Sequence, residues 1–72
     1  MVSEEFRNFI NAKKSEIRKK SDEFKHSESH LNFLKMRQIC ETLESMNELW
    51  IVSPSARELV VFFDEHDFIT FK

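Results

Sequence analysis

The sequence predicts an α+β domain in which two N-terminal helices, forming a helical hairpin, pack on a C-terminal three-stranded antiparallel β-meander. Apolar residues recur at helical spacing as far as Met46. Beyond Asn47 the apolar residues are mainly β-branched or aromatic and stand in short runs separated by turn residues. A chain of 72 residues buries only about 60% of its unfolded surface. We therefore expect one small domain, spanning residues 1–72, that gains stability from association.

The first predicted helix begins after Ser3, a favourable N-cap that is followed by Glu4 and Glu5 at the positive end of the helix dipole. Apolar residues then follow at helical spacing as far as Phe24. We expect a helix from residue 4 to residue 24. The polar residues 21–23 also allow a break there, because Ser21 could cap a new segment.

A second helix is predicted after the polar turn at residues 26–29. Its apolar residues cover an arc wider than a single stripe, namely Leu31, Phe33, Leu34, Met36, Ile39, Cys40, Leu43 and Met46. A helix with so broad an apolar arc is expected to contact more than one neighbour.

Three strands are predicted at residues 49–52, 58–64 and 68–71, joined by turns at 53–56 and 64–67. A rival interpretation remains open for residues 54–62. Ser53 as N-cap, Pro54 at the first helical position and a capping box to Glu58 would start a third helix there. The run from Val60 to Phe63 favours the strand.

Pairing Phe63 with Phe68 across the last turn sets the expected register of the hairpin. It predicts a core face made of Val60, Phe62, Ile69 and Phe71. The opposite face would carry Leu59, Val61, Phe63, Phe68, Thr70 and Lys72, four of them large apolar residues. An uncovered apolar face marks an interface. We therefore expect a homodimer or a protein partner there, with Thr70 and Lys72 as the polar rim, unless the helices cover both faces.

No enzyme active site, cofactor or small-molecule substrate is expected. The chain contains no glycine, which the dinucleotide fingerprint and the P-loop both require. His26 and His30 stand four residues apart, but Cys40 is the only further soft donor outside the acidic turn at 64–67, so no metal site is predicted. Cys40 itself is expected to be a buried apolar residue.

Charge is unevenly distributed, with nine Lys/Arg against six Asp/Glu up to Arg37 and two against seven beyond it. The basic residues of the first helix suggest the alternative function, a small nucleic-acid-binding regulator. Its contacts to phosphate would come from Lys13, Lys14, Arg18, Lys19 and Lys20. The overall pI of about 5.9 and the acidic residues of the same helix make this the weaker hypothesis.

A cytoplasmic location is expected. The single cysteine suits a reducing compartment, and the acidic residues after Met1 do not resemble a secretory signal. No stretch is apolar enough for a membrane helix. By association alone, small chains without glycine suggest accessory or regulatory proteins, including those of phages and mobile elements.

Overall fold

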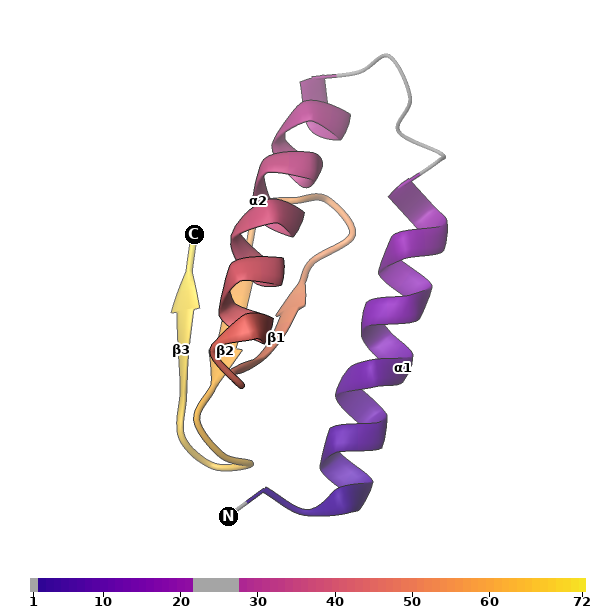
Figure 1. Ribbon diagram of the computed structural model, residues 1–72. Helices are drawn as coiled ribbons and strands as arrows, with labels where there is room; N and C mark the ends of the chain where they lie inside the picture. The colour runs from indigo at the N-terminus through magenta and orange to yellow at the C-terminus, as the bar shows by residue number, and fades with distance from the viewer. Residues whose placement is uncertain (1, 22–27) are drawn as a thin grey trace.

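The computed structural model describes residues 2–21 and 28–72 and confirms the predicted α+β order of two helices followed by an antiparallel sheet (Figure 1). Both helices pack against the first strand. Within the described ranges, neither helix combines the length and apolarity needed to cross a membrane. The elements are α1 (Glu4–Lys20), α2 (Glu28–Ser45), β1 (Leu49–Val52), β2 (Leu59–Phe62) and β3 (Phe68–Phe71).

Helix α1 begins as predicted, with the Ser3 hydroxyl accepting a hydrogen bond from the Phe6 amide at 3.1 Å. It ends at Lys20, with Ser21 as its C-cap. Three cations in the last turn oppose the negative end of the helix dipole, which favours this end point. The expected extension to Phe24 lies outside the described residues.

Helix α2 ends in a Schellman motif built without glycine. The amide of Asn47 donates to the Glu44 carbonyl, and the amide of Glu48 donates to the Leu43 carbonyl. Asn47 takes the left-handed conformation that the motif requires, with φ of 65°. Asparagine tolerates this region better than most residues. The chain therefore turns sharply from α2 into β1.

The β1–β2 connection settles the rival interpretation in favour of a strand. The Ser53 hydroxyl accepts hydrogen bonds from the Arg57 and Glu58 amides, both at 3.2 Å, which closes a loop instead of starting a helix. Ala56 sits in this loop with a positive φ of 59°. Its methyl group is buried in the core, which offsets part of the conformational cost.

The hairpin register differs from the predicted one by a single residue. Phe62, not Phe63, pairs with Phe68, and Val61 pairs with Ile69. The reason lies in the turn, where Asp64 accepts hydrogen bonds from the amides of His66 and Asp67 and shortens the loop. Because side chains alternate between faces, this one-residue shift moves every β3 side chain to the other face relative to β2.

The sheet, in the order β1-β2-β3, thus has two faces that differ from those predicted. We call inner the face that carries Trp50, Val52, Leu59, Val61, Ile69 and Phe71, and outer the face that carries Leu49, Ile51, Val60, Phe62, Phe68 and Thr70. Helix α2 covers the inner face with the fully buried Phe33 and Cys40. Helix α1 lies alongside the β1 edge (Figure 1). Its Phe6 ring reaches Phe62 on the outer face, with centroids 5.1 Å apart.

Candidate functional site

The main surface feature is an apolar groove of about 520 Å³ between α2 and β3. Its floor is the part of the inner face that α2 leaves open. Ile69 is 44% exposed and Phe71 is 52% exposed, although both share this face with the buried Leu59 and Val61. Helix α2 packs on β1, so the third strand extends beyond its cover. We call this feature, with its two charged rim residues Glu48 and Lys72, the α2–β3 groove.

The wall of the groove comes from a second apolar stripe on α2. Met36, Ile39, Leu43 and Met46 follow one another at spacings of three and four residues, which places them on one side of the helix. Met36 and Leu43 also pack against the core. Ile39 is 52% exposed and Met46 is 64% exposed. Two of the four side chains of the stripe therefore contact the core, and the other two are exposed to solvent.

Strand β3 adds an open backbone edge to the groove. It is the last strand of the sheet, all four of its residues are exposed, and no other described element lies along its outer side (Figure 1). The Phe63 amide donates to the Asp67 carbonyl at 2.8 Å, which makes these two residues a hydrogen-bonded pair. Hydrogen-bonded and non-bonded pairs alternate along an antiparallel ladder. Phe68, Thr70 and Lys72 therefore direct their backbone N–H and C=O groups away from β2.

The tip of the hairpin is held in place by its own acidic residues. Hydrogen bonds from the His66 and Asp67 backbone lower the pKa of the Asp64 carboxyl. The Glu65 carboxylate accepts a hydrogen bond from the Ser3 amide at 2.7 Å, and the bonds from Ser3 lower its pKa. This contact ties the start of α1 to the β2–β3 turn.

The residues predicted for the interface do not share one exposed face. Leu59 and Val61 are buried core residues, at 6% and 5% exposed, so their predicted exposure is wrong. Phe63 lines the groove and is exposed, as is Lys72 at its rim. Phe68 and Thr70 are exposed on the outer face. The C-terminal sheet does expose apolar residues: Phe63 and Phe68 as predicted, and Ile69 and Phe71 in place of Leu59 and Val61.

The residues that sequence reasoning missed are those of the α2 wall, together with Ile69 and Phe71. The broad apolar arc of α2 predicted that this helix contacts more than one neighbour, and part of the arc forms the groove wall. Ile69 and Phe71 were assigned to the core face, and they do lie on the inner face with Leu59 and Val61. They are exposed because α2 packs on β1 and leaves β3 uncovered.

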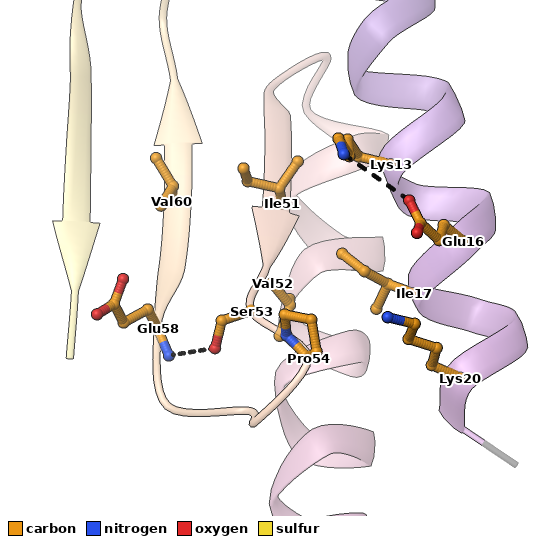
Figure 2. A pocket seen from close by; sticks show the side chains of 10 residues that line it. All are labelled: Lys13, Glu16, Ile17, Lys20, Ile51, Val52, Ser53, Pro54, Glu58 and Val60. Atoms are coloured by element: carbon orange, nitrogen blue, oxygen red, sulfur yellow. Dashed lines mark hydrogen bonds and ion pairs between the residues drawn. The ribbon is translucent and has the colours of Figure 1, made fainter. Parts of the chain in front are cut away.

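A second hollow, of about 370 Å³, lies between α1 and the β1–β2 loop (Figure 2). Its apolar floor includes Ile17, Ile51 and Val60, but charged residues surround it. One of them, Lys13, forms an ion pair with Glu16 at 3.8 Å. Mixed charge of this kind suits a hydrated surface better than an apolar partner.

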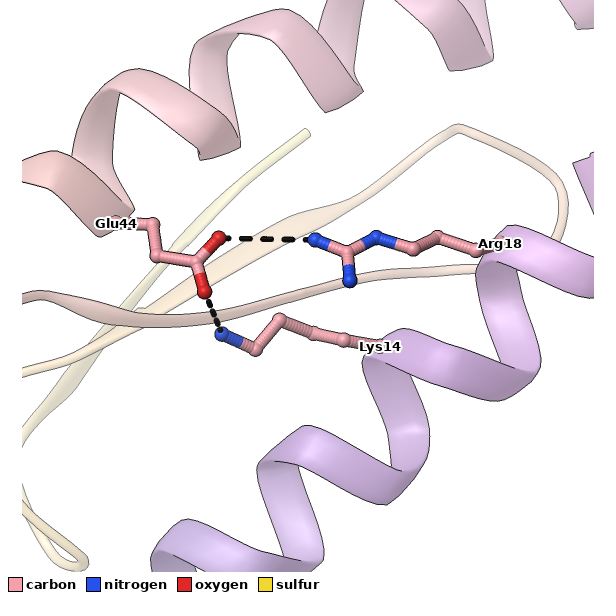
Figure 3. Close-up of polar contacts among 3 residues, drawn as sticks. All are labelled: Lys14, Arg18 and Glu44. Atoms are coloured by element: carbon pink, nitrogen blue, oxygen red, sulfur yellow. Dashed lines mark hydrogen bonds and ion pairs between the residues drawn. The ribbon is translucent and has the colours of Figure 1, made fainter.

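Two basic residues of α1 contact Glu44 on α2. Lys14 is only 4% exposed. Its ammonium lies 3.2 Å from a Glu44 carboxylate oxygen and 4.8 Å from the centre of the Trp50 ring. Arg18 binds the other oxygen of Glu44 at 3.6 Å (Figure 3). Lys14 therefore joins the two helices and is not available to a phosphate.

The other residues proposed for nucleic-acid contact reach the surface. Lys13, Arg18 and Lys19 are exposed, and Lys20 is half-buried beside the second hollow. Lys14 is therefore the one residue of this set that the fold buries.

No group of three or more metal-ligating side chains is found in the described ranges. His26, half of the predicted histidine pair, lies outside those ranges. The Nδ1 atom of His30 lies 3.1 Å from the Ser21 carbonyl oxygen. Cys40 is a fully buried free thiol, in the position expected for an apolar core residue.

Burial raises the pKa of the Cys40 thiol from 9.0 to about 12. The folded protein therefore keeps the neutral thiol at pH values where the unfolded chain ionises. We expect the free energy of unfolding to fall as pH rises from 9.0 toward about 12. Urea denaturation of wild type and Cys40→Ala across this range measures the effect, because the variant lacks the thiol contribution. Equal pH slopes for the two proteins would contradict it.

The chain matches no protein family, no curated protein and no solved structure.

Proposed function

We propose that this protein is a non-enzymatic protein-interaction module that binds through the α2–β3 groove and the open edge of β3. The observation that supports this most is the concentration of half-exposed large apolar side chains around one groove. Ile39, Met46, Phe63, Ile69 and Phe71 all line it. Contiguous apolar surface of this kind is characteristic of interaction sites.

The groove also has the anatomy of a protein interface. Its lining is apolar except for two charged residues, Glu48 and Lys72. An apolar centre with a polar rim is typical of such interfaces. The adjacent edge of β3 offers backbone groups for strand addition, a common way to bind an extended segment. A helix or a strand of a partner therefore finds both apolar contacts and hydrogen-bonding groups here.

An accessory or regulatory role in the cytoplasm follows from this proposal. The module would act by bringing proteins together, and its free Cys40 suits a reducing compartment.

Selection of random peptides displayed on phage tests the proposal without a known partner. The protein is immobilised sparsely, so that its copies do not meet. We expect enriched peptides to be apolar and to lose binding to a Phe71→Lys variant. Phe9→Lys is a matched control, because Phe9 on α1 is 50% exposed and Phe71 is 52% exposed.

Retention of the peptides by Phe9→Lys, with loss by Phe71→Lys, supports the groove as the binding surface. If no peptide is enriched, or if the enriched peptides bind both variants equally, the groove is not the interaction site. Circular dichroism of both variants establishes that each is folded before binding is compared.

A further inference from the structure

We infer that the occupant of the open β3 edge is a second copy of this chain, paired antiparallel about a two-fold axis that passes between the two Thr70 residues. This inference rests on the proposed function and names its partner. It follows from the backbone polarity of β3, from the alternation of its side chains, and from the amount of apolar surface near this edge.

The edge lacks the usual protection against pairing. Native edge strands are commonly guarded by a charge, a proline or a bulge. Strand β3 reads Phe68, Ile69, Thr70 and Phe71, with none of these devices. Its charged neighbours, Asp67 and Lys72, lie just outside the strand. An edge of this composition is suited to a strand partner.

Symmetry limits the registers that two copies can adopt. A two-fold axis normal to the sheet keeps both inner faces on the same side, so each residue must pair with one from the same face. Among the registers that satisfy this condition, those centred on a pair of Thr70 residues or a pair of Ile69 residues pair the most residues of β3 (Phe68–Phe71) with each other. The direction of the backbone groups distinguishes the two.

The Thr70-centred register uses both outward-facing residues of β3 and also Lys72, the residue that follows the strand. Thr70 pairs with Thr70 of the second copy, and Phe68 pairs with Lys72 of the second copy, so all three complete hydrogen-bonded pairs. In the Ile69-centred register, Lys72 would instead face His66, which lies in the hairpin turn. The first register is therefore favoured.

The side chains also match in the Thr70-centred register. Ile69 lies opposite Phe71 of the second copy on the inner face, a pairing of β-branched and aromatic residues that stabilises sheets. The two threonines face each other on the outer face and can exchange a hydrogen bond. The acidic turns at residues 64–67 lie at opposite ends of the junction, so their charges do not meet.

Apolar surface is available at this edge for a dimer to bury. On β3, Phe68, Ile69 and Phe71 are each about half exposed, and the Thr70-centred register brings all three next to the second copy. At roughly 200 Å² or less per large side chain, they offer about 300 Å² per copy. A standard interface buries about 800 Å² per partner, so we expect a dimer weaker than a standard one, formed as concentration rises.

Disulfide cross-linking of Thr70→Cys tests the inference. Paired Cα atoms in a hydrogen-bonded pair lie about 5.5 Å apart, within the range for a disulfide. Under mild oxidation we expect covalent dimers of Thr70→Cys to form roughly a hundredfold faster than those of Ser55→Cys, because contact replaces random encounter. Ser55 is the control, since it is exposed in the β1–β2 loop. Cys40 stays in place, because it is buried.

A second measurement does not depend on the cysteine. The Thr70 amide should exchange its hydrogen more slowly as protein concentration rises, because pairing protects it. Self-pairing would be overturned if Thr70→Cys and Ser55→Cys cross-linked at equal rates. It would also be overturned if the hydrogen-exchange rate of the Thr70 amide did not change with protein concentration. Faster cross-linking of Ile69→Cys than of Thr70→Cys would overturn the register. Neither result affects the peptide selection, which tests the groove separately.

Discussion

Val61→Lys is expected to abolish the cooperative fold, whereas Ile69→Lys leaves the protein folded. The two residues are direct partners in the β2–β3 ladder and lie on the same face of the sheet. Val61 is 5% exposed and belongs to the core, while Ile69 is 44% exposed in the α2–β3 groove. The two variants therefore test the effect of burial alone, because both residues occupy the same position in the ladder.

The magnitude of the first effect follows from the cost of burying an ammonium group. This cost is several kcal/mol even after relaxation, and a core as small as this one supplies only about 3–5 kcal/mol of net stability. For Ile69→Lys we expect a loss of about 1 kcal/mol or less, because the lysine can extend into water. Far-UV circular dichroism with urea denaturation measures both. Similar unfolding free energies for the two variants would contradict the register.

Phe71→Lys is expected to weaken self-association on the order of a hundredfold. Half of the Phe71 surface remains to be buried, which is worth about 1 kcal/mol or more for an aromatic side chain. The substitution acts twice in a symmetric dimer, so it removes about 2–3 kcal/mol of binding free energy, or roughly two decades in Kd. Phe9→Lys should leave Kd unchanged, since Phe9 lies on α1.

The fold was predictable from local patterns. Ser3 with its two glutamates predicted the start of α1, and the β-branched runs after Asn47 predicted three strands at nearly the observed bounds. These features depend on neighbours within a few residues, where propensity and capping act. The polar Ser21, noted as a place for a break, is where α1 ends.

The faces of the sheet were not predictable to the same degree. They depend on whether the β2–β3 turn contains three residues or four, and the side chain of Asp64 makes the shorter turn. That one-residue difference placed Val61 on the wrong face. Ile69 does lie on the inner face, but it is exposed because α2 packs on β1 and leaves β3 uncovered. The wide apolar arc of α2 predicted more than one neighbour, but it could not say which strand the helix would cover.

The burial of Lys14 also lay beyond sequence reasoning. In the helix it resembles its exposed neighbours Lys13 and Lys19. Its position depends on Glu44 and Trp50, which come from other elements and meet it only in the folded chain. The nucleic-acid hypothesis counted it as a free cation for this reason.

We propose that the open edge of β3, beside the α2–β3 groove, is occupied by a second copy of this chain. Sedimentation equilibrium over a micromolar to millimolar concentration series tests it most directly, with wild type, Phe71→Lys and Phe9→Lys compared. We expect wild type and Phe9→Lys to approach the mass of a dimer as concentration rises, while folded Phe71→Lys remains a monomer of 8.7 kDa. A wild type that stays monomeric throughout, or a Phe71→Lys variant that dimerises like wild type, would contradict the claim.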